Sequence, residues 1–201
     1  MEKVLVAAFG PFGGESMNPA LEAVRLLPGS VAGVRLVRTE LPVSYERAPR
    51  AVEEVLRAER PDVVVCAGQA GGRAQVSIER VALNLADAVA PDVDGCRPCD
   101  EPLVADAPAA LFATVPTRRM VQAVRDAGLP AQLSYSAGTF VCNATLFRLL
   151  WMLEREASAV RAGFVHVPFA PEQLTGKPAG TPAMPVEDAA RALEAAIAAA
   201  L

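Results

Sequence analysis

The sequence predicts an α/β protein: a single-domain, three-layer α/β/α sandwich with a mainly parallel, mixed and twisted sheet. Two observations predict this class. Apolar runs of strand length alternate along the chain with segments of helical periodicity, which favours a sheet covered by helices on both faces. The chain also has 201 residues and 52% hydrophobic content, enough for one substantial core, so we expect one domain over residues 1–201.

Several segments predict strands. Some are continuous apolar runs, typical of strands buried on both faces, and others alternate between apolar and polar residues. These segments are residues 3–9, 33–42, 61–68, 76–86, 130–136 and 163–169. Ligands of such sheets bind beyond the carboxyl ends of the strands, so the loops that follow the strands are where a site is expected.

Other segments have helical periodicity. They are residues 20–27, 44–60, 117–128, 142–156 and 185–201. Asn18 and Pro19 fit the cap and the first position of the first helix, and Pro49 predicts that the second helix begins close to it, because proline is tolerated in the first turn. Residues 88–116 and 170–184 are rich in proline and glycine and are expected to be loops.

Composition and charge exclude some classes of function. The net charge is −4, without the clustered lysine and arginine that nucleic-acid binding requires. No apolar run approaches the ~20 residues that cross a bilayer. The N-terminus has neither the basic region nor the cleavage site of a signal peptide. We therefore expect a cytoplasmic protein that binds neither nucleic acid nor membrane.

Four cysteines, Cys66, Cys96, Cys99 and Cys142, are expected to be free thiols in a reducing compartment. Cys96 and Cys99 form a C-x-x-C, but they lie in an expected loop, whereas a redox C-x-x-C usually opens a helix after a strand. A zinc site needs about four cysteine or histidine ligands, and the sequence has one histidine. No metal site is expected, and whether the C-x-x-C pair ever forms a disulfide stays open.

Two glycine-rich segments, FGPFGG (9–14) and GQAGGR (68–73), follow predicted strands. Neither has the spacing of a dinucleotide-binding or phosphate-binding loop, so no nucleotide cofactor is expected. Their glycines either allow tight turns or let the backbone approach a small ligand closely.

Cys142 lies in SYSAGTFVCNATLF, between a polar stretch and an apolar helical run. A free cysteine is most often a small buried apolar residue. If the helix begins near residues 139–142, however, the thiol lies in its first turn. The helix dipole and the unpaired N–H groups there favour a thiolate and could hold an oxyanion during acyl transfer.

His166 and Glu79 are the candidate partners of that thiol. His166 lies between two valines in a predicted strand and faces away from both, and it is the only histidine available as a base. Glu79 lies inside an apolar segment, where an unpaired charge is expensive to bury. It is either a solvated charge at a strand end or a carboxylate that orients the histidine. Its neighbour Arg80 would face the other side of the strand.

These segments together resemble the pyroglutamyl peptidase I family of cysteine peptidases. The resemblance covers most of the chain in order and is strongest in two long segments, one around Glu79 and one around Cys142. The segments that carry it are VLVAAFGPFGGESMNPA, PDVVVCAGQAGGRAQVSIERVALNLADA, PDVDG, SYSAGTFVCNATLF and GFVHVPF.

The resemblance implies a function and a set of site residues. It implies that Cys142 is the nucleophile, His166 the general base and acid, and Glu79 the third member of a catalytic set. The substrates it implies are peptides with an N-terminal pyroglutamyl residue, and it implies no cofactor, a cytoplasmic location and a homotetramer. The residues implied to bind the substrate are Phe9, Phe12, Gln69, Phe140 and Val141. For each phenylalanine the alternative is ordinary core packing.

The sequence departs from the expected family pattern at three positions. Val89 stands where an arginine is expected, and Ala90 is smaller than the bulky apolar residue expected there. Ala144 stands where a histidine is expected, and no role is assigned to it. Two further hypotheses therefore stand beside an active peptidase. One is a catalytically weakened relative that binds pyroglutamate. The other is a nucleoside phosphorylase-like enzyme on the same architecture, which would need an anion site that the sequence does not offer.

Overall fold

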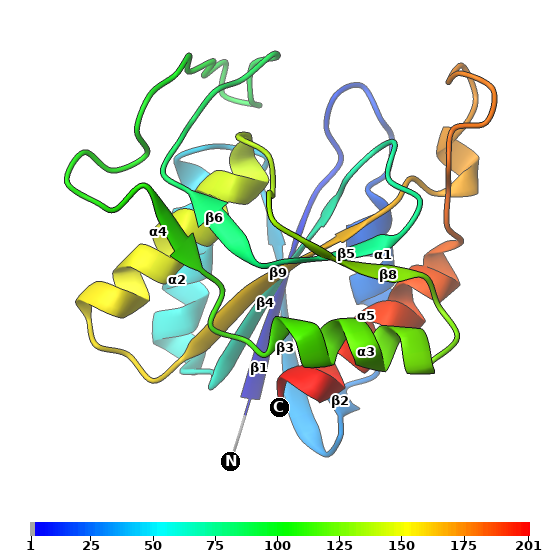
Figure 1. The fold of residues 1–201 in the computed structure, drawn as a ribbon, viewed down its shortest axis with the longest axis horizontal. Helices are drawn as coiled ribbons and strands as arrows, with labels where there is room; N and C mark the ends of the chain where they lie inside the picture. The colour runs from blue at the N-terminus through cyan, green and yellow to red at the C-terminus, as the bar shows by residue number, and fades with distance from the viewer. Residues whose placement is uncertain (1–2) are drawn as a thin grey trace.

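A computed structural model describes residues 3–201, and its central element is a seven-stranded sheet with the order β2-β3-β1-β4-β9-β5-β8 (Figure 1). The strands are β1 (Lys3–Phe9), β2 (Ser30–Val31), β3 (Val34–Leu41), β4 (Val63–Gln69), β5 (Val76–Glu79), β8 (Ala131–Ser134) and β9 (Arg161–Val167). Strands β3, β1, β4 and β9 are mutually parallel. β5 runs antiparallel to β9 and parallel to β8, so the predicted mixed, mainly parallel sheet is confirmed.

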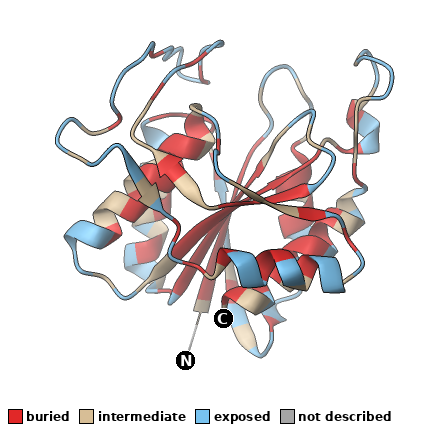
Figure 2. Cartoon of the chain, viewed as in Figure 1, coloured by how far each residue is buried: buried red, intermediate tan, exposed pale blue. Residues whose placement is uncertain are grey.

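Helices cover both faces of the sheet, as the sequence predicts (Figure 1). The helices α1 (Pro19–Leu26), α3 (Thr117–Asp126) and α5 (Val186–Ala200) share one apolar core with one face. The helices α2 (Arg47–Glu59) and α4 (Val141–Arg155) share a second core with the other face. Figure 2 shows that the strands at the centre are buried, because helices lie against both of their faces.

The helix starts follow the capping residues of the sequence. Asn18 caps α1: its side-chain oxygen accepts a hydrogen bond from the N–H of Ala20 at 3.0 Å, and Pro19 is the first helical residue. Helix α2 begins at Arg47, which places Pro49 in the first turn, where its missing N–H has no intrahelical partner to lose.

The predicted strand over residues 76–86 is wrong in one respect, because the chain leaves the main sheet after Glu79. The backbone of Arg80 donates to Ser134 O at 2.7 Å and accepts from the N–H of Ala113 at 3.0 Å. The chain then forms β6 (Val81–Leu83), which pairs with β7 (Ala110–Phe112) in a separate two-stranded sheet. Strands of three residues are too short for alternation to reveal.

Other short elements also differ from the prediction. Strand β7 lies inside the stretch 88–116 that was expected to be loop, and a 3₁₀ turn, η1 (Pro171–Gln173), lies inside the second expected loop. None of the helices within residues 3–201 is long and apolar enough to cross a membrane. The loops that follow β1, β4 and β6 gather with the N-terminus of α4 at one end of the molecule, opposite the C-terminus (Figure 1).

Candidate active site

Cys142 is the second residue of α4, whose N-cap is Phe140. The thiol therefore lies in the first turn of a helix, as the sequence predicts. Its sulfur lies against β4: a Cβ added to Gly68 would lie 3.1 Å from Cys142 Sγ and 3.0 Å from Cζ of Phe164. Position 68 therefore needs a glycine to leave room for the thiol.

His166 lies on the strand next to Gly68. The two residues are register partners in the parallel pair β4–β9, so Cys142 and His166 border the same glycine. Side chains alternate along a strand, and His166 shares the face of Phe164, whose ring lies 4.6 Å from the imidazole. This is the face that α4 covers, whereas Val165 and Val167 point into the opposite core.

Glu79, the last residue of β5, holds His166. Because β5 runs antiparallel to β9, Glu79 pairs with Phe164 and lies diagonally across from the imidazole, within reach of it. The Nδ1–H of His166 donates to Oε1 of Glu79 at 2.8 Å, and Glu79 is fully buried. The bond leaves Nε2 as the nitrogen free to accept a proton. The alternative of a solvated strand-end charge is therefore wrong.

Arg73 is a second partner of that carboxylate, which the sequence analysis missed. Its guanidinium donates to Oε1 of Glu79 at 2.6 Å and to the carbonyl of Ser136 at 2.9 Å. Arg73 ends the segment GQAGGR, for which only the glycines were considered, either as turn residues or as a close approach to a small ligand. The charge of Glu79 was the sequence signal for such a partner, because a buried carboxylate requires a cation or several hydrogen-bond donors nearby.

Opposing effects act on the pKa of Glu79. Burial raises it, but the hydrogen bond and charge of His166 lower it. A hydrogen bond with Ser134 and the charge of Arg73 also lower it, and the net pKa lies below the ordinary value of 4.5. Glu79 is therefore ionised at neutral pH, although it is fully buried.

The pKa of Cys142 moves in the other direction. The residue is partly exposed, but the protein atoms around its sulfur desolvate it, and this burial is the main cause that raises its pKa to about 12. Arg73 and a backbone hydrogen bond oppose the rise without reversing it. A thiol with this pKa is neutral at pH 7, whereas its position at a helix start predicts a thiolate. A base must accept the proton during the reaction.

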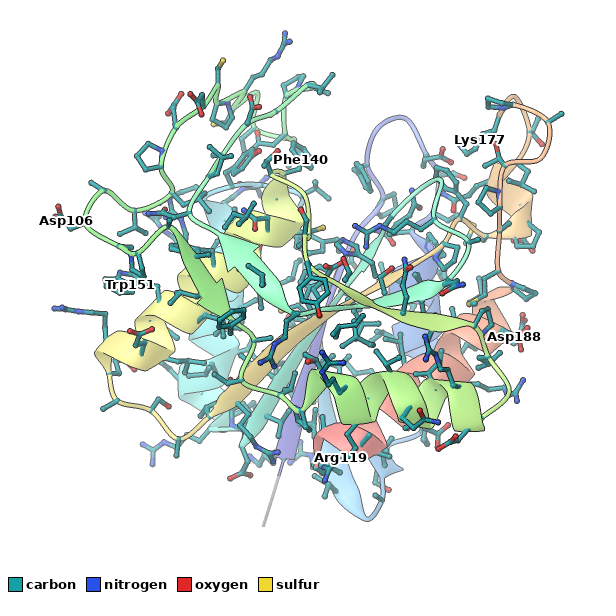
Figure 3. The ribbon with its side chains drawn as sticks, in the orientation of Figure 1. Asp106, Arg119, Phe140, Trp151, Lys177 and Asp188 are labelled. Atoms are coloured by element: carbon teal, nitrogen blue, oxygen red, sulfur yellow. The ribbon has the colours of Figure 1, made fainter. Side chains whose placement is uncertain are left out.

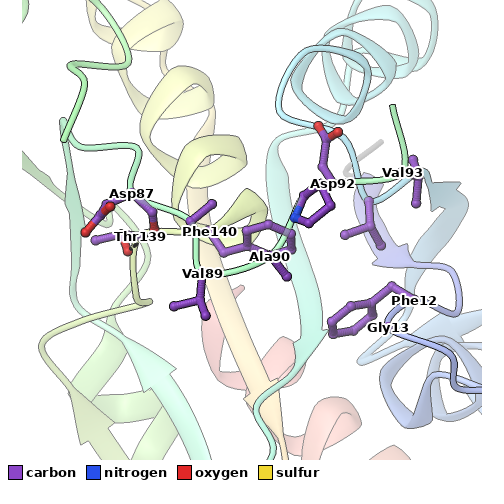
Figure 4. A pocket seen from close by; sticks show the side chains of 12 residues that line it. Phe12, Gly13, Asp87, Val89, Ala90, Asp92, Val93, Thr139 and Phe140 are labelled. Atoms are coloured by element: carbon purple, nitrogen blue, oxygen red, sulfur yellow. Dashed lines mark hydrogen bonds between the residues drawn. The ribbon is translucent and has the colours of Figure 1, made fainter. Parts of the chain in front are cut away.

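A cavity of about 540 Å³ reaches the N-terminus of α4, where Phe140, two residues before Cys142, lines it (Figure 4). Its walls come from the β1–α1 loop, the segment after β3, the residues before α4 and the whole loop from Asp87 to Val93. The lining residues are Phe12, Gly13, Val43, Asp87, Ala88, Val89, Ala90, Pro91, Asp92, Val93, Thr139 and Phe140. Figure 3 shows Phe140 at the end of α4 where the loops gather, with Trp151 farther along the same helix.

Comparison with known proteins agrees with this geometry. The family model for pyroglutamyl peptidase matches residues 2–201. The pyrrolidone-carboxylate peptidase of Thermococcus kodakarensis is 45% identical over 195 residues, which cover 97% of this chain and 94% of the relative. The protein of that name from Enterococcus faecalis is 47% identical over 176 residues, covering 88% of this chain and 83% of the relative.

Solved structures show the same likeness. Pyroglutamyl peptidase I of Bacillus amyloliquefaciens superposes with a TM-score of 0.94 at 37% identity, covering 100% of this chain and 95% of that one. Pyrrolidone carboxyl peptidase of Thermococcus litoralis also gives 0.94 at 37% identity, covering 100% and 93%. The chain belongs to the pyroglutamyl peptidase family. The resemblance drawn from the sequence is confirmed, and the protein is a cysteine peptidase rather than a phosphorylase-like enzyme.

Within this pyroglutamyl peptidase, the five residues expected to bind substrate have different surroundings. Phe12 and Phe140 line the cavity. Phe9 does not line the cavity. It is 2% exposed and stacks on Phe164 in the core, because its side chain points from β1 toward α2 and α4. Val141 is fully buried in the same core, so only its backbone is free for a ligand. Gln69 is engaged elsewhere, since its Oε1 accepts from Nε2 of Gln173 at 2.9 Å.

Tyr45 supports the cavity from behind and was not singled out by the sequence analysis. Its ring meets Phe140 edge-on at 5.5 Å, and its hydroxyl donates to the carbonyl of Thr139 at 2.9 Å. The Thr139 hydroxyl in turn donates to the carbonyl of Asp87 at 2.7 Å. The ring of Phe140 and the loop that faces it are thus held in fixed positions by the same small network.

Asp92 organises that loop. The carboxylate is almost fully buried and accepts from the N–H groups of Tyr45, Asp94 and Cys96 at 2.8–2.9 Å. The bonds to Asp94 and Cys96 are local and form the turn that the motif PDVDG predicts. The bond to Tyr45 is long-range, so the sequence alone does not predict it. The C-x-x-C turn is attached to the cavity wall through these bonds, and the four cysteines, all within residues 3–201, are free thiols.

Proposed function

We propose that this chain hydrolyses the amide bond that follows an N-terminal pyroglutamyl residue of peptides. Cys142 is the nucleophile, His166 the general base and acid, and Glu79 the residue that orients His166. The bond between the fully buried Glu79 and Nδ1 of His166 carries the proposal, because it presents Nε2 beside a cysteine at a helix start. Family membership supports the reaction.

The first step transfers the thiol proton of Cys142 to Nε2 of His166 as the sulfur attacks the pyroglutamyl carbonyl. The raised pKa of Cys142 means that this proton moves during attack rather than before it. Glu79, ionised and hydrogen-bonded to Nδ1–H, stabilises the imidazolium that forms.

The oxyanion of the tetrahedral intermediate needs donors, and the first turn of α4 supplies them. The first N–H groups of a helix have no intrahelical acceptor, and here they belong to Val141, Cys142 and Asn143. The positive end of the helix dipole adds to their effect. Buried Val141 takes part in this role through its backbone alone.

The intermediate then collapses to an acyl-enzyme. The carbon–nitrogen bond breaks, a thioester to Cys142 remains, and the leaving amine takes the proton from His166. Water then attacks the thioester while His166 accepts its proton, and the thiol leaves with that proton restored. The products are free pyroglutamate and the shortened peptide, so the cycle needs no cofactor.

The cavity suits the pyroglutamyl ring. The ring is a neutral lactam, and the side chains of Phe12 and Phe140 offer apolar faces on either side of the cavity. Phe9 supports this arrangement indirectly, through Phe164 and the imidazole packed on it.

We also propose that one domain over residues 1–201 acts in the cytoplasm, as a homotetramer.

A fluorogenic pyroglutamyl-arylamide tests the proposal. We expect the wild-type chain to release the arylamine, and Cys142→Ala and His166→Ala to abolish turnover. Cys142→Ala should keep a melting temperature close to the wild type, whereas His166→Ala should lower it, because the buried Glu79 loses a partner. Cys99→Ala is the matched control, because Cys99 is an exposed free cysteine outside the cavity lining.

One observation favours a second candidate function. Val89, 93% exposed, lines the cavity where the family pattern predicts an arginine. A weakened relative would bind a pyroglutamyl analogue and react with thiol reagents at Cys142 without turning the arylamide over. That result would decide against the peptidase proposal.

A further inference from the structure

The cavity is larger than the ring that the proposed function places in it. Its volume of about 540 Å³ lies within the range of about 300–1,000 Å³ that holds drug-sized ligands, whereas a five-membered lactam is much smaller. We propose that this pocket also admits N-terminal acyl groups one ring size larger than pyroglutamyl, namely six-membered lactams. This inference rests on the proposed function and extends its substrate class.

The position of the cavity assigns the spare volume to the acyl group. The lining ends at Phe140, two residues before Cys142, and includes neither Gly68 nor His166. The leaving amine must lie beside His166, which donates its proton. The cavity instead lies between Phe12 and Phe140, where the proposed function places the lactam ring, so we assign its spare volume to the acyl group.

Part of the cavity lining consists of small or exposed apolar residues. Ala90 and Val93 belong to it together with Val89, and in Figure 4 Ala90 lies between Phe140 and Phe12. Ala90 has only a methyl group to offer, and Val93 is 53% exposed, so neither fills the space between the rings. An added ring methylene meets apolar surface there rather than a polar group that it would desolvate.

The charges of the lining also suit a neutral ring. Among the lining residues, all within the described chain, the charged ones are Asp87 and Asp92. Asp92 is engaged with three backbone N–H groups, and Asp87 is exposed to solvent. A lactam bears no charge in either ring size, so enlarging it changes the apolar contacts alone.

The reaction is the same acyl transfer. The amide bond of the six-membered lactam acyl group breaks, a thioester to Cys142 forms, the leaving amine takes the proton from His166, and water releases the free lactam acid. The variable between the two substrates is therefore one methylene in the cavity.

The test compares two arylamides with the same leaving group, one carrying a pyroglutamyl and one a 6-oxopiperidine-2-carbonyl acyl group. We expect the wild-type kcat/KM values to differ by less than about tenfold. Ala90→Ile, which fills the space between the rings, should lower kcat/KM for the six-membered substrate at least ~10-fold relative to the five-membered one, the range that one methylene produces in an apolar pocket. Ala58→Ile makes the same substitution at an exposed alanine of α2 outside the cavity lining, and it is the matched control that should keep the wild-type ratio.

The outcomes separate this inference from the proposed function. Hydrolysis of the pyroglutamyl substrate with a six-membered substrate more than about tenfold poorer in the wild type overturns the inference and leaves the function standing. If Ala90→Ile lowers kcat/KM equally for both substrates, the space beside Ala90 does not discriminate between the two ring sizes. This result also overturns the inference. A chain that hydrolyses neither substrate overturns both proposals. The wild-type comparison does not depend on whether Ala90→Ile folds.

Discussion

At the residue scale, the site depends on a balance between burial and hydrogen bonding. Glu79 keeps its charge in the core because His166 and Arg73 both donate to the same oxygen. Cys142 has no such compensation and keeps its proton. Glu79, which carries the charge, takes no direct part in bond making. Cys142, the nucleophile, stays neutral until it attacks the carbonyl.

Gly68→Ala tests how closely the thiol is held. The added Cβ would lie 3.1 Å from Cys142 Sγ and 3.0 Å from Cζ of Phe164, so the sulfur must move from its position beside Gly68, and a displacement of about 1 Å can cost ~100-fold in rate. We expect kcat on the pyroglutamyl-arylamide to fall by about 100-fold, with some loss of stability because the buried ring of Phe164 must also shift. Gly29→Ala is the control, since a Cβ at Gly29 meets nothing within 4 Å. Unchanged kcat in Gly68→Ala would show that the site does not depend on this contact.

At the scale of elements, Asn143 fastens α4 to the segment that leaves the main sheet. The residue is fully buried one position after the nucleophile. Its Oδ1 accepts from the N–H of Leu83 at 2.8 Å, and its Nδ2 donates to the carbonyls of Leu83 and Leu85 at 2.9 and 3.0 Å. The helix that bears Cys142 and the strand β6 that leads into the cavity wall are therefore positioned by one side chain.

Asn143→Ala should destabilise the fold markedly, because it leaves three backbone groups of the β6 segment without a partner. Each buried group left unpaired costs about 1–3 kcal/mol, so we expect a loss of at least ~2 kcal/mol in the free energy of unfolding, measured by urea denaturation. Gln122→Ala removes a side-chain amide from the exposed face of α3, where it bonds Asp126, and should change this free energy by less than ~0.5 kcal/mol. Equal effects of the two substitutions would contradict the anchoring role.

At the scale of the whole molecule, the sequence could predict what local patterns determine. The apolar runs, the cap at Asn18 and the helix start before Cys142 are local, and they led to the α/β class and to the candidate nucleophile. Arg73, Tyr45 and Asp92 escaped because their roles depend on partners that only the folded chain brings close. The same reason explains β6 and β7, whose three-residue strands are defined by pairing with each other rather than by pattern.

Acid stability is a property of the whole molecule that follows from its paired carboxylates. The pKa values of Glu79, Glu15, Glu59 and Asp94 lie below their ordinary values: Glu79 is held down by His166, and the other three by Lys177, Lys3 and Arg47. A carboxyl whose pKa is lower in the folded state binds fewer protons than in the unfolded state. Its contribution is complete above its ordinary pKa and is lost as pH falls through the folded value. We therefore expect the free energy of unfolding to fall steadily once pH drops below about 4.5, the ordinary value for glutamate.

Urea denaturation between pH 3 and 7, read with two variants, checks this and isolates the buried carboxylate. Glu79→Gln removes the titrating group, so the variant should be less stable at pH 7, where Arg73 and His166 lose their anionic partner, and should lose less stability than the wild type between pH 5 and 3. Glu54→Gln alters an exposed glutamate on α2 that forms no ion pair with residues 3–201, and its pH profile should match the wild type. A Glu79→Gln profile with the wild-type slope would mean that Glu79 does not link folding to pH, and that its charge is not held by the contacts described for it.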